Sequence, residues 1–144
     1  VFFLVPTQAH CMLVGMTSGL QNKVSVQDFG LTGQTHADGL AVGRASGFVG
    51  GVMKHLISGI LSLEDYHLYD LMRDIVNTED IFLEPSACAS FWGPIQLKSK
   101  EIQAYIQEKG LSDVMQNATH IPWATGGSLV PAEIREEYMH TYLK

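Results

Sequence analysis

The chain has 144 residues, the size of one ordinary domain, which can close a hydrophobic core without disulfides or structural metal. It is acidic, with a formal net charge of −6, and its basic residues form no cluster, so a role in binding nucleic acid is disfavoured. The uncharged stretch over residues 1–22 is interrupted by Pro6, His10 and Gly15, and it therefore predicts neither a membrane-spanning helix nor a signal peptide.

The first third of the chain alternates short apolar runs with helical periodicity, which is typical of an α/β or α+β fold. We expect a strand over residues 1–5 and a helix over residues 9–16 that ends near Gly19. Residues 23–27 alternate between polar and apolar side chains and predict a short strand. Between residues 29 and 43 the glycines are too dense for a regular helix or strand, and Asp38-Gly39 is typical of a tight turn.

Two amphipathic helices are predicted in the middle of the chain. Helical spacing predicts one buried face made of Val49, Val52, Met53, Leu56, Ile57 and Ile60. Ser62 is the expected N-cap of the second helix, because an acidic first turn follows it. The core stripe of that helix consists of Leu68, Leu71, Met72, Ile75 and Val76. The short apolar run 81–83 predicts a buried strand.

The last third is expected to contain further helices and one strand. Ser86 can cap a small helix over residues 87–91 that ends at Gly93-Pro94, and a longer amphipathic helix is predicted over residues 99–109. Residues 118–124 predict a strand that runs into a turn at residues 125–128. Pro131 suits the first position of the last helix. Because no linker or repeat interrupts these elements, we expect one compact unit over residues 1–144.

The start of the chain and its two cysteines indicate what kind of protein it comes from and in which compartment. The sequence has no initiator Met and opens directly in an apolar, strand-like run, which is rare for a small domain, so we expect a fragment of a longer protein. Cys11 and Cys88 lie in apolar surroundings, which favours two buried free thiols in a reducing compartment, and hence a cytoplasmic protein.

A search for catalytic motifs leaves two stretches of interest. The six histidines lack the HExxH spacing of a zinc site, and no Cys-x-x-Cys or G-x-S-x-G occurs, so the metal content stays unknown and a hydrolase is disfavoured. The glycine-dense loop 37–42, and the predicted strand end at 123–127 that presents Thr125 before two glycines, favour a ligand pocket. Plain turn chemistry is the alternative at both places.

At these stretches the chain resembles the bacterial D-serine dehydratases, which are pyridoxal-phosphate enzymes of fold type II. The resemblance runs in order through residues 25–28 (SVQD), 37–50 (ADGLAVGRASGFVG), 83–87 (LEPSA), 117–120 (NATH), 123–127 (WATGG) and 130–131 (VP). The shorter motifs are shared with threonine and serine dehydratases, whereas the long run from 25 to 50 is more specific.

The resemblance implies an α/β, tryptophan-synthase-β-like domain with three layers, helix, sheet and helix, and it implies pyridoxal 5′-phosphate as the cofactor. For the intact enzyme it implies β-elimination of D-serine to pyruvate and ammonia. It also implies that the lysine that holds the cofactor and the loop that binds its phosphate belong to an upstream remainder of the same polypeptide. The chain would then be the carboxyl-terminal third of the enzyme, without a catalytic residue of its own and inactive alone.

Three residues match cofactor-binding positions of that family. Gly39 matches the glycine against which the pyridine ring lies, Thr125 matches the hydroxyl beside the pyridine nitrogen, and Gly126 follows it. The resemblance thus implies a neutral hydroxyl beside the nitrogen, which leaves the nitrogen unprotonated. An unprotonated ring stores negative charge poorly, which favours prompt loss of the substrate's β-hydroxyl. Glu84 matches a carboxylate near the edge of the cofactor, with no proton-transfer role assigned.

One departure from the family concerns a monovalent cation. Val5 stands where relatives usually carry a Glu that helps to bind it, and the neighbouring matches, the Ala9 carbonyl and the Cys11 side chain, are weak ligands without that carboxylate. Two other interpretations also stay open: a relative of threonine or L-serine dehydratase, and a truncated, non-catalytic module that serves only in assembly. The reading frame upstream of Val1 would separate the enzyme from the module.

Overall fold

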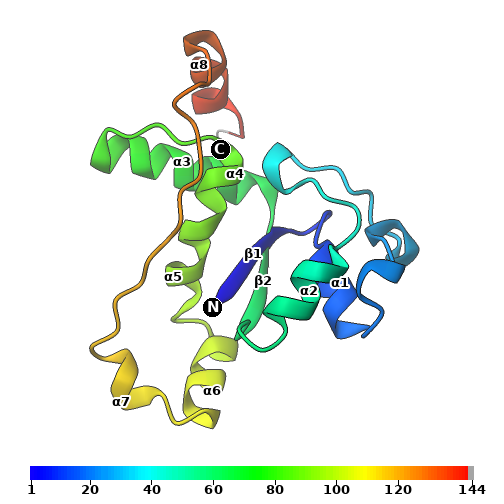
Figure 1. The fold of residues 1–144 in the computed structure, drawn as a ribbon. Helices are drawn as coiled ribbons and strands as arrows, with labels where there is room; N and C mark the ends of the chain where they lie inside the picture. The colour runs from blue at the N-terminus through cyan, green and yellow to red at the C-terminus, as the bar shows by residue number, and fades with distance from the viewer. Residues whose placement is uncertain (143–144) are drawn as a thin grey trace.

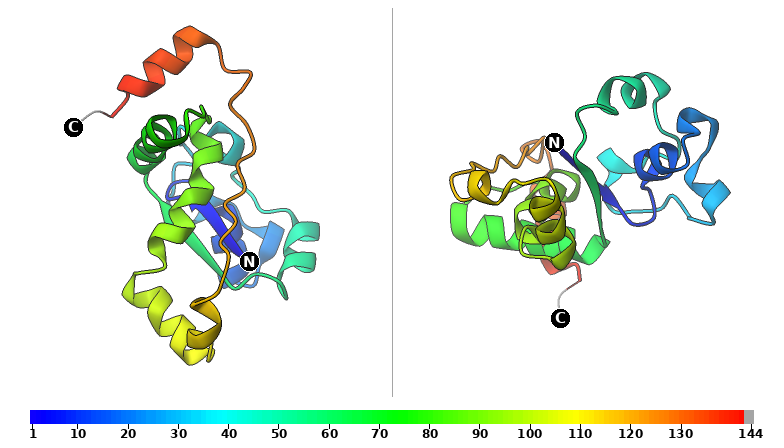
Figure 2. Two further views of the ribbon diagram at one scale, coloured as in Figure 1. Left: turned by 90° about the vertical axis from the view of Figure 1, so that its left-hand side faces the viewer. Right: turned by 90° about the horizontal axis from the view of Figure 1, so that it is seen from below.

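A computed structural model describes residues 1–142 of the chain. Its sheet contains two parallel strands, β1 (Phe2–Pro6) and β2 (Gly59–Leu63), which pair from Phe2 opposite Gly59 to Pro6 opposite Leu63. The sheet lies between two layers of helices (Figures 1 and 2). One layer holds α1 (Cys11–Thr17) and α2 (Gly47–Met53). The other holds α3 (Asp65–Glu79), α4 (Pro85–Cys88) and α5 (Trp92–Gln96).

Alternation of side chains along the strands creates a separate core on each face of the sheet. Leu4 and Leu63 point towards α3 and α4 and join the larger core cluster, in which Leu68 and Met72 are fully buried. Phe3 and Ile60 point to the opposite face and join the smaller cluster: Cys11, Met12, Val14, Val26 and Ala45. The predicted three-layer α/β class is therefore confirmed.

Elements with a strong local signal form close to where they are predicted. The strand at the start of the chain and the helix that follows it are confirmed, as is the core stripe of α3, of which only Val76 is not fully buried. Helix α6 (Lys100–Glu108) begins at the Ser99 cap, whose hydroxyl accepts a hydrogen bond from the Ile102 amide at 3.3 Å. Gly110 ends it in the left-handed region, with φ of +64°.

The helix predicted over residues 49–60 is shorter than expected, and its apolar side is not buried. Helix α2 ends at Met53, because residues 59–63 pair with β1 and the chain must turn before the strand begins. Its apolar side chains do not form a buried face, since Val52 is 51% exposed and Phe48 is 82% exposed. Ser62 consequently lies in β2, and Glu64 rather than Ser62 is the N-cap of α3.

Three predicted strands do not form within residues 1–142. Within 23–27 only Val24 and Ser25 are extended, between the 3-10 turns Gln21–Lys23 and Val26–Phe29, and Ser25 makes a single antiparallel bridge with Arg44. The second turn begins at Ser25 because the Asp28 carboxylate accepts hydrogen bonds from the Ser25 amide and hydroxyl and closes a capping box. Residues 81–83 and 118–124 have no strand partner in the described part of the chain, and a strand requires a partner for its backbone groups.

The carboxyl-terminal half continues as helices joined by a long extended segment. The small helix predicted to end at Gly93-Pro94 continues through it, because Pro94 lies in the first turn of α5, where a missing N–H costs little. After α6 come α7 (Ser112–Met115), the extended residues, and α8 (Ala132–His140), whose N-cap is Pro131. No helix within residues 1–142 is both long and apolar enough to cross a lipid bilayer.

Candidate functional site

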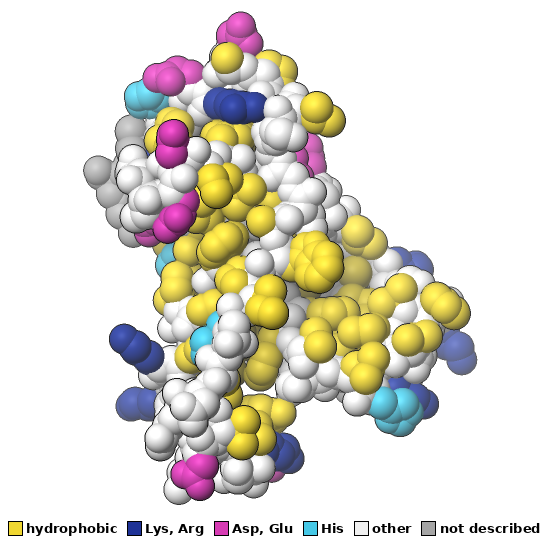
Figure 3. Space-filling view, turned by 60° about the vertical axis from the view of Figure 1, so that its left-hand side comes forward, with side chains coloured by type: hydrophobic (Ala, Val, Ile, Leu, Met, Phe, Trp, Pro, Cys, Tyr) yellow, Lys and Arg dark blue, Asp and Glu magenta, His cyan; other side chains and the backbone are white. Residues whose placement is uncertain are grey.

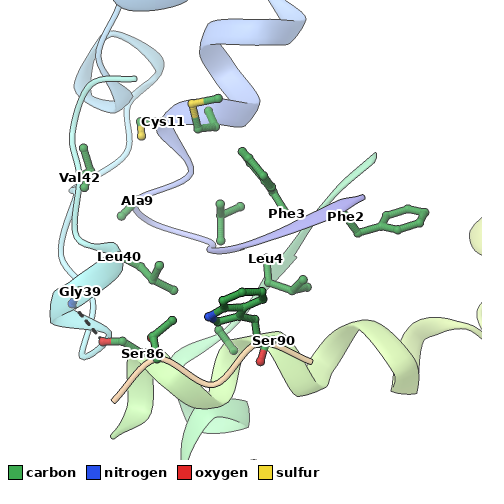
Figure 4. Close-up of a pocket in the computed structure, with 15 residues that line it drawn as sticks. Phe2, Phe3, Leu4, Ala9, Cys11, Gly39, Leu40, Val42, Ser86 and Ser90 are labelled. Atoms are coloured by element: carbon green, nitrogen blue, oxygen red, sulfur yellow. Dashed lines mark hydrogen bonds between the residues drawn. The ribbon is translucent and has the colours of Figure 1, made fainter. Parts of the chain in front are cut away.

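A cavity of about 350 Å³ lies along β1, between the loop 38–42, helix α4 and the extended segment that contains Trp123 and Thr125 (Figure 4). It brings together Gly39 and Thr125, two of the three residues predicted to bind the cofactor. The remaining wall is mostly apolar and comes from β1, from residues 9–12 and from Leu40, Val42 and Ala89. The cavity is open, since Gly39 and Thr125 are both exposed to solvent.

Gly39 is held in this wall by Ser86, which is not the expected helix cap but lies inside α4, whose N-cap is Glu84. The Gly39 amide donates a hydrogen bond to Ser86 Oγ at 3.0 Å, and a Cβ placed on Gly39 would lie 3.3 Å from both Oγ and Cβ of Ser86. Since the oxygen of Ser86 already accepts from Gly39, its own O–H is free to donate to a ligand in the cavity. The sequence signal for this role was the position of Ser86 in the segment LEPSA.

The third predicted residue, Gly126, does not line the cavity but lies behind it, against Glu84. The Glu84 amide donates to the Gly126 carbonyl at 3.3 Å, and a Cβ on Gly126 would lie 3.0 Å from Glu84 Oε1. At Gly127 the fit is tighter: φ is +137°, and a Cβ would lie 2.7 Å from the Glu84 nitrogen and from Leu83 Cα. The Gly126-Gly127 pair therefore packs its backbone directly on the backbone that precedes α4.

The positions linked to a cation, Val5, Ala9 and Cys11, lie together on one wall of the cavity. Their side chains present no oxygen, and burial raises the pKa of the Cys11 thiol, which keeps it protonated. Hard cations prefer oxygen ligands, so these side chains do not suit one. No group of three or more His, Cys, Asp or Glu residues in the described chain is arranged to hold a metal ion.

None of the five lysines within residues 1–142 lines the cavity, whose lining contains no basic side chain from the described residues. The sixth, Lys144, lies outside the described residues. The polar groups that the described chain offers at the cavity are the hydroxyls of Thr125, Ser86 and Ser90, the Trp123 indole N–H, the Cys11 thiol and the Gly39 backbone. Such a set can orient a neutral ring and hydrogen-bond to it, and it supplies no nucleophilic amine.

Curated proteins from several bacteria match nearly the whole chain. A protein named probable D-serine dehydratase from Geobacillus stearothermophilus is 50% identical over 138 residues, which is 95% of this chain and 30% of that protein. One of the same name from Fusobacterium nucleatum is 47% identical and covers 100% of this chain, which corresponds to 33% of its own length. The chain thus spans about a third of the length of these relatives. The resemblance indicated by the motifs is confirmed.

A solved structure shares the fold. The processed form of threonine deaminase isoform 2 from Solanum lycopersicum superposes with a TM-score of 0.59 over 95% of this chain and 34% of its own chain, at 15% sequence identity. At that identity the likeness shows the fold alone, and it supports the fold class expected from the sequence. No protein-family model matches the chain.

Proposed function

We propose that this chain is the carboxyl-terminal part of a D-serine dehydratase, and that the intact protein uses pyridoxal 5′-phosphate to convert D-serine to pyruvate and ammonia. The observation that carries the proposal is the cavity in which Gly39 and Thr125 meet. Relatives that are 46–50% identical to the chain carry this name, which agrees with it. A cytoplasmic location belongs to the same proposal and is supported by two buried free cysteines.

The residues present suit the pyridine side of the cofactor. A volume of about 350 Å³ with an apolar wall is in the range of small-molecule pockets. Gly39 lines the cavity with backbone only, and Ser86 fills the space that a Cβ on Gly39 would take. Thr125 would hold the pyridine nitrogen through its hydroxyl. When bound, the cofactor supplies an electron-withdrawing ring that makes the Cα–H bond of an attached amino acid acidic.

The chain's own contribution is to orient that ring and to keep its nitrogen neutral. A Thr hydroxyl exchanges one hydrogen bond with the nitrogen and brings no charge, so it does not stabilise a protonated ring as a carboxylate would. Ser86 holds the Gly39 amide and so fixes the surface on which the ring rests. The amine that attaches the cofactor and the groups that bind its phosphate are expected in the upstream two-thirds of the protein.

The test is a comparison of the full-length protein with the 144-residue chain, both with added pyridoxal phosphate. Pyruvate or 2-oxobutanoate is measured with lactate dehydrogenase, and the substrates are D-serine, L-serine and L-threonine. We expect turnover of D-serine by the full-length protein and none by the chain alone. Preference for an L-amino acid would replace this proposal by an L-serine or threonine dehydratase. No turnover of any of the three would favour a non-catalytic protein.

A further inference from the structure

The side chain of Arg135 folds back from the first turn of α8 over the turn that follows the Gly126-Gly127 pair. Its Nε donates to the Val130 carbonyl at 2.8 Å, and one terminal nitrogen donates to the Ser128 carbonyl at 2.8 Å and to the Gly127 carbonyl at 3.5 Å. The guanidinium carbon also lies 4.8 Å from the centroid of the Phe82 ring. One side chain therefore joins the turn 127–130 to the segment that precedes α4.

The chemistry of these contacts suits arginine alone among the basic residues. Arg135 is half-buried and takes part in no ion pair within residues 1–142, so its charge faces carbonyl dipoles and an aromatic ring. A planar guanidinium can donate in two directions while one face lies on a ring, and a lysine ammonium cannot do both.

We call the contacts of Arg135 with the turn 127–130 and with Phe82 the clamp. A continuous series of contacts leads from this clamp to the cavity. Behind Arg135, Gly127 lies on the backbone of residues 82–84 with no room for a Cβ, and the Glu84 amide donates to the Gly126 carbonyl. Glu84 is the N-cap of α4, and two residues later Ser86 accepts the hydrogen bond of the Gly39 amide. Thr125, directly before Gly126, is thus tied to the wall that contains Gly39.

We propose that Arg135 is a positioning residue of the cofactor site. It presses the turn 127–130 onto residues 82–84 and so sets where the Thr125 hydroxyl lies relative to Gly39. It touches neither the cavity nor a reacting atom and acts only through the Gly126-Gly127 backbone. The inference rests on the proposed function insofar as Thr125 and Gly39 face the cofactor.

The clamp itself is tested by hydrogen exchange in the full-length protein, with Arg135→Gln compared with Arg73→Gln. Arg73 is the control, since it too is partly buried and donates to backbone carbonyls, those of Met139 and Thr141, at the far end of α8; unlike Arg135, it also forms an ion pair with Asp70 at 2.7 Å. The amides of Glu84 and Val130 donate to the Gly126 and Gly127 carbonyls at 3.3 and 3.2 Å. We expect both amides to exchange at least about tenfold faster in Arg135→Gln, because the turn that carries these carbonyls is no longer held, and to be unchanged in Arg73→Gln. Equal protection in both variants would overturn the proposal.

The effect on the site is measured by titrating the cofactor-free, full-length protein with pyridoxal phosphate. Arg135→Gln is expected to raise the Kd at least about fivefold relative to Arg73→Gln, and to lower kcat more than it raises KM for D-serine. Arg135→Lys should recover part of the affinity, because an ammonium reaches some of the carbonyls.

A purely structural role for Arg135 makes a different prediction. Both glutamine variants would then lose thermal stability in the cofactor-free state and bind pyridoxal phosphate with the Kd of the wild type, which would overturn the positioning role. If the wild-type protein neither binds pyridoxal phosphate nor forms pyruvate, the proposed function fails, and the exchange rates alone decide whether the clamp exists.

Discussion

Thr125 lines the same cavity as Gly39, and its hydroxyl is the group that the proposed function requires at the pyridine nitrogen. In the full-length protein, Thr125→Ala leaves that nitrogen without its partner. We expect the rest of the full-length protein to cover this open cavity, and a hydrogen bond lost in a covered site costs about 1–3 kcal/mol, so kcat for D-serine should fall about ten- to a hundredfold. Thr125→Ser should lower kcat only mildly, because the hydroxyl is kept.

Thr125→Asp tests the same position by spectroscopy. A carboxylate beside the nitrogen favours its protonation, and negative charge can then be held in the ring for longer. With D-serine this variant should show an absorbance band well to the red of the band of the resting enzyme. An unchanged kcat and no long-wavelength band would mean that Thr125 is not at the nitrogen and merely belongs to the extended segment.

At Gly127 the backbone conformation and the neighbouring backbone leave no room for a side chain. Its φ of +137° is poorly accessible to residues with a side chain, and the Cβ of an alanine would lie 2.7 Å from two backbone atoms of residues 83 and 84. We expect Gly127→Ala to lower the free energy of unfolding by about 3 kcal/mol in urea denaturation of the full-length protein. Gly30→Ala is the control, because Gly30 also has a positive φ, while a Cβ on it would meet no other part of the described chain within 4 Å.

The control separates two sources of strain. Gly30→Ala carries only the cost of the left-handed backbone, about 1 kcal/mol. Equal losses in the two alanine variants would show that the backbone contact between Gly127 and residues 82–84 contributes nothing.

At the scale of elements, α6 shows how a local signal defines a helix. Ser99 accepts the Ile102 amide at 3.3 Å, while Ile102 and Ile106 are buried one turn apart. Removing an N-cap hydroxyl costs about 1 kcal/mol, so Ser99→Ala should lower the urea midpoint of the full-length protein accordingly. Ser112→Ala, at an exposed position in the first turn of α7, should leave the midpoint unchanged. Equal urea midpoints for the two variants would contradict a stabilising role of the Ser99 cap.

The strands behave differently from the helices. Residues 81–83 and 118–124 have the apolar character of strands, yet within residues 1–142 only β1 and β2 form a ladder. A helix satisfies its backbone groups internally, so caps and a 3.6-residue period in the sequence suffice to define α3 and α6. A strand needs a neighbour, which no local pattern supplies.

At the scale of the whole molecule, the described chain exposes extensive apolar surface (Figure 3). Phe48, Ile121 and Trp123 are 82%, 79% and 78% exposed, and Val52 and Leu56 on or after α2 are more than half exposed. Surfaces of this kind normally become covered by another part of the protein or by a second molecule. Together with its match to a third of its relatives' length, this agrees with the proposal that the chain is one part of a larger enzyme.

The chain alone should therefore self-associate and bind a hydrophobic dye, whereas the full-length protein should bind less dye per mole. Light scattering coupled to gel filtration and dye fluorescence measure both properties. Phe48→Asp should reduce association and dye binding, because it interrupts the exposed face of α2, and Lys54→Asp at the end of the same helix should not. A strictly monomeric chain without dye affinity would count against the larger enzyme.

The elements with local signals follow from the sequence: α3 and α6 were recognisable because their apolar periods lie within one helix. At Gly39 and Thr125 the local pattern left a ligand pocket and a plain turn open, and the resemblance to D-serine dehydratases, which includes the segment LEPSA, singled these residues out. Helical periods depend on neighbours a few residues away, so they can be identified along the chain.

Which of these residues meet depends on the tertiary structure. The Gly39 amide reaches Ser86 because the turn 38–40 packs against α4, and Gly126-Gly127 packs on the backbone of residues 82–84, more than 40 residues away in the sequence. Arg135 had no sequence signal at all, since a guanidinium that binds carbonyls and a ring is recognised by position and not by motif. Contacts between distant segments arise from packing, which the local pattern of a sequence does not encode.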